Sequence, residues 1–166
     1  MSQYFGSSAD FQAYLNNLPN EKVGEFVPFD AAYYASKYMG AYQGTLTPFD
    51  HFFSIGAARG YAPSASFDPV VYVSQYSDLR GLDSVDLLAH YLTYGLDEGR
   101  LGTSAMFGFD GERYLSENPD VAAYINANLD DFGGSELNGA SAHYIKFGSA
   151  EGRLAYTTAG SPISLN

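Results

Sequence analysis

The sequence contains three copies of one repeat, and this repeat constrains the fold more than any other feature. Each copy opens with Phe-Asp-x-x-x-Tyr and continues to a second block, His-x-x-x-x-Gly-x-x-x-Gly, with both spacings unchanged in all three copies. Self-similarity of this kind is typical of arrays in which each unit buries its apolar surface against a neighbour. The copies span residues 29–66, 67–108 and 109–156.

The opening motif has the residue types of a helix N-terminus. Asp30, Asp68 and Asp110 follow the opening Phe of the three copies, and Asp is a favoured N-cap because its carboxylate accepts hydrogen bonds from free N–H groups of the first turn. The preceding Phe and the Tyr five residues later hold the two positions of a hydrophobic staple. Each opening therefore predicts a short helix that begins after its Asp.

The second block predicts a further helix that ends at glycine. Leu88, Tyr91 and Leu92, for example, share one helical face in copy two. The first glycine of each block follows the last periodic residue, where we expect the left-handed conformation of a helix C-terminus, and the second marks another tight turn. The first glycines are Gly56, Gly95 and Gly148, and the second are Gly60, Gly99 and Gly152.

These patterns predict an all-α fold, a compact array of three short helical repeats with an N-terminal helix and an irregular C-terminal tail. The expected division is an N-terminal helix and linker at 1–28, a three-repeat domain at 29–156 and a tail at 157–166. A hydrophobic fraction of 46% is ample for a core. The N-terminal helix is expected near Ser8–Asn17.

Charge and composition exclude several functional classes. Eight Lys and Arg against nineteen Asp and Glu leave a formal charge of -11, which argues against nucleic-acid binding because that affinity depends on cationic phosphate contacts. The chain has no apolar run as long as the ~18 residues that a spanning helix needs, so we expect no membrane insertion. Without cysteine, it has no disulfide, thiolate nucleophile or Cys-ligated metal.

The histidines of the chain occupy one repeat position, as His51, His90 and His143. Histidine is a common metal ligand and general base, so a functional role is one interpretation. Equivalent positions in successive repeats are spaced apart along an array, however, and three such residues do not converge on one ion. We therefore expect the three histidines to be structural.

Arg100 and Arg153 follow the second glycine in copies two and three. Either could clamp an anionic ligand, but we expect a structural ion pair with a repeat acid such as Asp110. Glu98 and Glu151 recur beside them, and although paired carboxylates can carry glycosidic chemistry, a solvated acidic turn is commoner. Because no nucleophile elbow, phosphate loop, dinucleotide motif or zinc-protease motif is present, we expect no enzymatic activity.

The third copy carries an insertion of about eleven residues between Asn126 and Gly139. Carboxylate and amide oxygens are concentrated there around glycines, which suits a hard cation such as Ca²⁺, although the spacing is not that of an EF-hand loop. A calcium site and a solvated surface loop are both open interpretations. The candidate ligands are Asp130, Asp131, Glu136 and Asn138.

Six tyrosines fall outside the staples and second helices. Exposed tyrosines on an acidic, lysine-poor surface are typical of faces that bind proteins or carbohydrates. Packing against the core is the alternative for each of them. The candidate partner-binding residues are Tyr4, Tyr14, Tyr42, Tyr61, Tyr124 and Tyr156.

Copies two and three share Phe-Asp-x-x-x-Tyr and His-Tyr-x-x-x-Gly-x-x-Glu-Gly-Arg, and copy three adds Asn-Pro-Asp-Val between them. This pattern resembles a tandem helical module of bacterial secreted and surface proteins, which often lies beside RTX-type calcium-binding repeats and is also appended to some glycosyltransferases. The resemblance implies export without a cleaved N-terminal signal, by a one-step (type I) route that reads a segment such as Thr157–Asn166. Copy one departs from the pattern, with Arg59-Gly60-Tyr61 where the others have Glu-Gly-Arg, and fits a capping repeat.

The residues and the resemblance together lead us to expect a non-enzymatic extracellular or cell-surface protein. Such a protein would be a surface-layer, filament or biofilm-matrix subunit that acts in adhesion or assembly. Its partners would be further copies of itself, another surface protein or a polysaccharide, with calcium as a candidate cofactor. The alternative is a carbohydrate-binding accessory module of a secreted protein, with an aromatic platform as its binding face.

Overall fold

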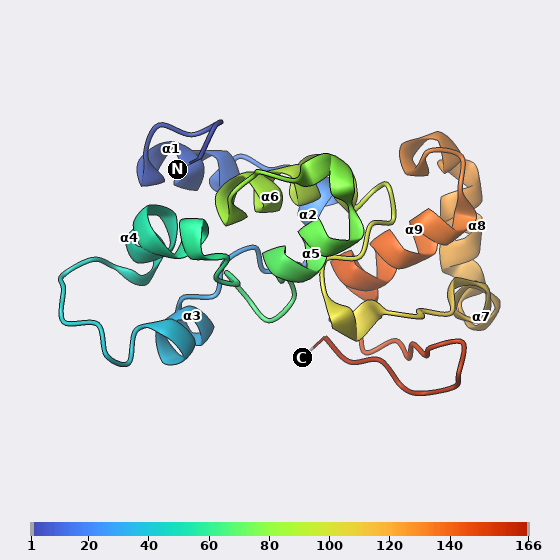
Figure 1. Cartoon of the computed structure of the whole chain (residues 1–166). Coiled ribbons are helices and arrows are strands. Elements are labelled where there is room, and N and C mark those ends of the chain that lie inside the picture. Colours follow the sequence, from blue (N-terminus) through green and yellow to red (C-terminus); the bar gives the residue numbers. More distant parts are fainter. Residues whose placement is uncertain (1, 166) are drawn as a thin grey trace. The chain divides into compact units, whose positions relative to one another are not determined.

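The computed structural model describes residues 2–165 and confirms the all-α fold (Figure 1). Within these residues the chain forms helices and isolated β-bridges but no strand. It divides into two compact units. Unit 1 holds the residues up to Pro19 together with Val27–His90, and unit 2 holds Asn20–Phe26 together with the residues from Tyr91 onward. This division falls inside the second copy and differs from the predicted boundaries.

Unit 1 is built from α1, which is the predicted N-terminal helix, and from the helices of copy one and the first half of copy two. Its core is aromatic, with Phe11, Tyr34, Phe52, Phe67 and Tyr72 all fully buried. The α-helices are α1 (Ser8–Asn16), α3 (Ala31–Tyr38), α4 (Pro48–His51), α5 (Pro69–Gln75) and α6 (Ser84–His90). The shorter elements are η1 (Phe52–Gly56), η2 (Ala57–Arg59) and η3 (Ser77–Leu79).

Unit 2 contains the third copy, and the insertion of that copy is mostly helical. One helix ends at Glu117, and the next begins at Pro119 and runs for nine residues. The α-helices are α2 (Asn20–Val23), α7 (Gly111–Glu117), α8 (Pro119–Ala127) and α9 (Glu136–His143). The shorter elements are η4 (Tyr91–Gly95), η5 (Ser104–Met106), η6 (Leu129–Phe132) and η7 (Tyr144–Gly148).

The predicted N-caps and staples are present in all three copies. The carboxylates of Asp30 and Asp68 each accept hydrogen bonds from two backbone N–H groups, and that of Asp110 accepts one from Arg113. The Phe and Tyr rings of each staple lie 5.4 to 5.5 Å apart between centroids. Local sequence therefore determines where α3, α5 and α7 begin and how the chain enters them.

The second helices end differently from the prediction. Each passes into a five-residue π-helical segment, η1, η4 or η7, that stops at the first glycine of the block. Gly56 has φ -67°, and neither Gly95 nor Gly148 has a positive φ, so the predicted left-handed conformation at these residues is wrong. The left-handed residues are the second glycines of the blocks, Gly60, Gly99 and Gly152.

A close approach explains why two of the first glycines are glycine. A Cβ atom on Gly56 would lie 2.1 Å from the Tyr34 hydroxyl, and one on Gly148 would lie 2.2 Å from the Tyr114 hydroxyl. Distances below about 3 Å are far inside van der Waals contact, so any side chain would displace the tyrosine. Because glycine has no Cβ atom, the tyrosine hydroxyl can pack directly against the backbone of the π-helical segment at these positions.

The C-terminal tail is irregular, as predicted, and its backbone is hydrogen-bonded to the ends of the second and third copies. Thr158 N–H donates to the Gly108 carbonyl and Ile163 N–H to the Ala155 carbonyl, both at 2.8 Å. The Tyr144 hydroxyl donates to the Ile163 carbonyl, and the Ile163 side chain is buried. Nowhere in residues 2–165 is there a helix with the length and apolarity to span a bilayer.

The steric role of Gly148 can be tested with an alanine. We expect Gly148→Ala to lower the free energy of unfolding by about 1–3 kcal/mol, because the added methyl group overpacks the site against Tyr114. Gly40→Ala is the matched control, since a Cβ there meets nothing within 4 Å and φ is not positive. Urea unfolding measures both, and equal stabilities of the two variants would refute the close-approach explanation.

Candidate functional site

The tyrosine of each staple forms a hydrogen bond with the histidine of its own copy. In every copy the phenol Oη lies 2.9 Å from the imidazole Nδ1. The histidines therefore lie in three separate pairs and do not converge on one site. The pairs are Tyr34–His51, Tyr72–His90 and Tyr114–His143.

In copy three, burial favours the neutral form of both groups of the pair. It lowers the pKa of His143, with the nearby carboxylates of Glu151 and Asp120 opposing and the Arg153 guanidinium reinforcing this effect. It also raises the pKa of the Tyr114 hydroxyl. A neutral imidazole accepts at one nitrogen and donates at the other. We assign the Tyr114 hydroxyl as the donor to Nδ1 of His143, which places the proton of the ring on Nε2.

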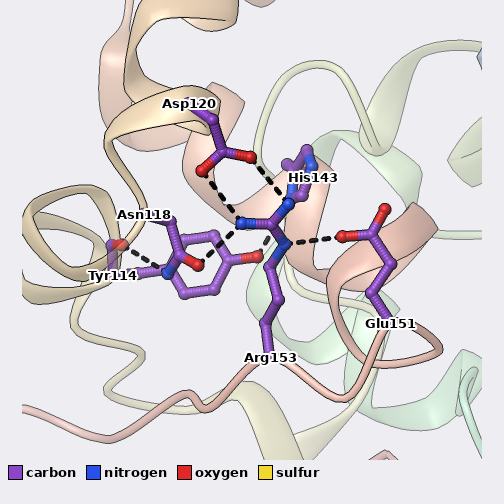
Figure 2. A network of polar contacts seen from close by, with 6 residues as sticks. All are labelled: Tyr114, Asn118, Asp120, His143, Glu151 and Arg153. Carbon is purple, nitrogen blue, oxygen red and sulfur yellow. Dashed lines mark hydrogen bonds and ion pairs between the residues drawn. The ribbon is translucent and has the colours of Figure 1, made fainter.

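Arg153 connects the last turn of the third copy to the junction between α7 and α8 (Figure 2). Its two terminal nitrogens donate to the two carboxylate oxygens of Asp120 at 3.0 and 2.7 Å, and Nη1 also donates to Asn118 Oδ1 at 2.8 Å. Its Nε donates to Glu151 at 2.5 Å. Asn118 in turn donates to the Tyr114 carbonyl at 2.8 Å, so the arginine clamp and the Tyr–His pair belong to one network.

Arg153 pairs with a repeat acid other than Asp110, the example given above. Asp110 caps α7, whereas Asp120 of the Asn-Pro-Asp turn pairs with the arginine, and this ion pair lowers the pKa of Asp120. In copy two Arg100 pairs with Glu98 at 2.6 Å. Glu98 and Glu151 are therefore each ion-paired with the arginine of their own copy.

Copy one replaces the arginine clamp with an aromatic stack. Tyr61 follows Gly60 as Arg153 follows Gly152, and its ring stacks on Tyr38 with centroids 4.1 Å apart and planes 7° apart. The Tyr38 hydroxyl accepts a hydrogen bond from the Ala62 N–H. The departure of copy one from the Glu-Gly-Arg pattern is thus a change in how the last turn is held.

The structure separates the six candidate partner-binding tyrosines. Tyr4 and Tyr124 are exposed, at 65% and 53%. The other four are half-buried and contact their own chain. Tyr14 donates to the Ala89 carbonyl, Tyr42 packs on the His51 ring, Tyr61 stacks on Tyr38, and the Tyr156 ring lies 3.6 Å from the Arg113 guanidinium. Packing, the alternative interpretation, describes these four.

Several exposed apolar side chains were not predicted from the sequence. Leu154, Val70 and Tyr94 are 66%, 58% and 56% exposed. Apolar residues in a helical repeat are expected to face the core, and no motif distinguishes these three. Lys146, which is buried, was also missed because a single lysine within an apolar segment carries no recognisable spacing.

The four candidate calcium ligands do not form a cluster of carboxylates. Asp130 and Asp131 lie in η6, Glu136 begins α9, and the side-chain amide of Asn138 donates to the Phe132 carbonyl at 3.2 Å. Among residues 2–165, no three His, Asp or Glu side chains lie close enough together to hold a metal ion. The geometry of a single chain therefore gives the calcium prediction no support.

No family model matches the chain, and neither a curated protein nor a solved structure matches it. The resemblance to the secreted helical module therefore rests on the repeat motif alone.

The Tyr114–His143 pair predicts a specific pH dependence of stability. Because folding lowers the pKa of His143 below its ordinary 6.5, the unfolded chain binds more protons in this range and stability rises with pH. The contribution is complete above about pH 6.5 and is lost as the pH falls toward the lower pKa of the folded state.

Urea unfolding of the parent protein and of His143→Gln between about pH 5 and 8 measures this contribution. We expect stability to fall with pH less steeply in the variant, whose amide oxygen still accepts a hydrogen bond but does not titrate in this range. Identical slopes for the two proteins would contradict the assignment.

Proposed function

We propose that this protein is a non-enzymatic structural subunit of the bacterial cell surface or extracellular matrix, and that it self-associates through apolar side chains of its repeats. One observation carries the proposal. The polar residues that recur in the repeat form hydrogen bonds or ion pairs within their own copy, whereas large apolar side chains beside them are exposed. Leu154 directly follows Arg153, and Val70 lies in the first turn capped by Asp68.

These exposed side chains stand on well-anchored backbone. Leu154 lies between the clamped Arg153 and Ala155, whose side chain is buried and whose carbonyl accepts from Ile163. The N–H of Val70 donates to Asp68 at 2.9 Å. Because the backbone at these side chains is already ordered, association costs little additional backbone entropy. This favours protein–protein contacts through them.

The charge of -11 opposes the association of like copies. Divalent cations would weaken this repulsion by screening and by bridging carboxylates of two copies. The carboxylates of Asp130, Asp131 and Glu136 are exposed and suit such a role between chains. We therefore propose calcium as an aid to assembly. The absence of cysteine suits an extracellular structural protein that does not rely on disulfides.

Light scattering coupled to size-exclusion chromatography tests this function. We expect masses that are multiples of 18.0 kDa, with larger species in calcium than in chelator. Leu154→Ser and Val70→Ser should each shift the distribution toward the monomer, because each removes an exposed apolar contact. Gln43→Ser, which changes an exposed polar residue of unit 1, should leave it unchanged. A parent protein that is monomeric in both buffers would refute the proposal.

A further inference from the structure

We infer that unit 2 contains a binding pocket for one neutral sugar residue, lined by Tyr124, Lys146 and His143. The pocket has a volume of about 270 Å³ and lies among α2, α8, η6, α9 and η7. Residues from the third-copy insertion, among them Phe132, line it. The pocket therefore uses two features that the repeat itself does not require, the insertion and a tyrosine outside the repeat positions.

Aromatic rings form one part of the lining. Tyr124 on α8 is 53% exposed, Phe147 in η7 is half-buried, and Phe132 in η6 is buried. The C–H face of a pyranose ring is apolar and packs against such rings, while the sugar hydroxyls point away to polar groups. Tyr124 is the ring with the largest accessible face, and we assign it the stacking position.

A buried ammonium group forms the polar part of the lining. Lys146 is 5% exposed, and its Nζ donates to Asp97 at 2.5 Å and to the Glu21 carbonyl at 3.2 Å. Lys22 pairs with the other oxygen of Asp97, also at 2.5 Å. Because an ammonium carries three N–H groups, these two contacts leave Lys146 one donor for a ligand. The Lys146 carbonyl accepts from the Glu25 N–H at 2.7 Å, which holds the segment in place.

Further donors and acceptors complete the lining. His143 uses Nδ1 in its bond with Tyr114, so Nε2 is the nitrogen left to form a hydrogen bond with a ligand. Asp131 contributes an exposed carboxylate that accepts hydrogen bonds. A hydroxyl group both donates and accepts hydrogen bonds. A ligand with several hydroxyl groups therefore matches a pocket lining that holds both donors and acceptors.

The charges of the lining select for a neutral ligand. Three carboxylates, Glu21, Asp97 and Asp131, face two ammonium groups, Lys22 and Lys146. The excess carboxylate and the charge of -11 disfavour an anion, and the two ammonium groups disfavour a cation. The volume is just below the ~300–1,000 Å³ of small-molecule pockets, which suits one sugar residue of a longer chain.

Isothermal titration calorimetry with neutral oligosaccharides tests the pocket. The probes are cellohexaose, xylohexaose, mannohexaose and maltohexaose, with polygalacturonic acid as the anionic comparison. We expect at least one neutral probe to bind and the polyanion not to bind. Tyr124→Ala should weaken that binding by about tenfold or more, because the stacking face is lost. Tyr124→Phe, which keeps the ring, should bind within about threefold of the parent protein.

Tyr4→Ala is the matched control, because Tyr4 is exposed to a similar extent and belongs to unit 1. It should leave binding unchanged. The inference is overturned if no neutral probe binds, or if Tyr124→Ala binds as well as Tyr4→Ala while both remain folded. It does not rest on self-association, since light scattering of Tyr124→Ala reports the assembly state independently of sugar binding.

Discussion

The hydrogen bond between a buried tyrosine hydroxyl and a histidine Nδ1 is the contact on which each copy of the repeat depends. It joins the capped helix of a copy to its second helix, with Oη and Nδ1 2.9 Å apart in all three. The Phe of the staple positions the tyrosine, and the caps of α3, α5 and α7 set the direction of the helix that carries it. In copies one and three, a glycine beside the hydroxyl removes the Cβ that would exclude it. Phe, Asp, Tyr, His and Gly recur together because they build this contact.

Interactions within one helical turn could be predicted from the sequence, and interactions between distant segments could not. Asp30, Asp68 and Asp110 cap helices through N–H groups two or three residues away, so the motif alone is sufficient to place them. The need for glycine at position 56 depends instead on the Tyr34 hydroxyl, which lies twenty-two residues earlier in the chain. The spacing of Gly56 in the motif is equally compatible with the left-handed conformation of a helix C-terminus. The prediction of that conformation was therefore wrong.

The candidate site follows the same rule. Tyr14, Tyr42 and Tyr156 pack against backbone or rings that no local pattern specifies. Arg153 pairs with Asp120, thirty-three residues away, in preference to the cap residue Asp110. Lys146 and Asp97 occupy positions of the second block that the motif leaves unspecified, so their ion pair could not be predicted from it. Repeat residues therefore define the framework, and residues outside the repeat, Tyr124 and the insertion, distinguish the third copy and supply its pocket.

NMR correlation of the imidazole nitrogens with the ring protons, recorded at neutral pH, tests the central role of the Tyr–His contact most directly. The contact predicts that His51, His90 and His143 are each neutral and in a single tautomer, with Nδ1 hydrogen-bonded to a tyrosine hydroxyl that exchanges slowly with water. Rings that are charged, or averaged between the two tautomers, would contradict it. They would show that the recurring histidine does not hold the two helices of its copy together.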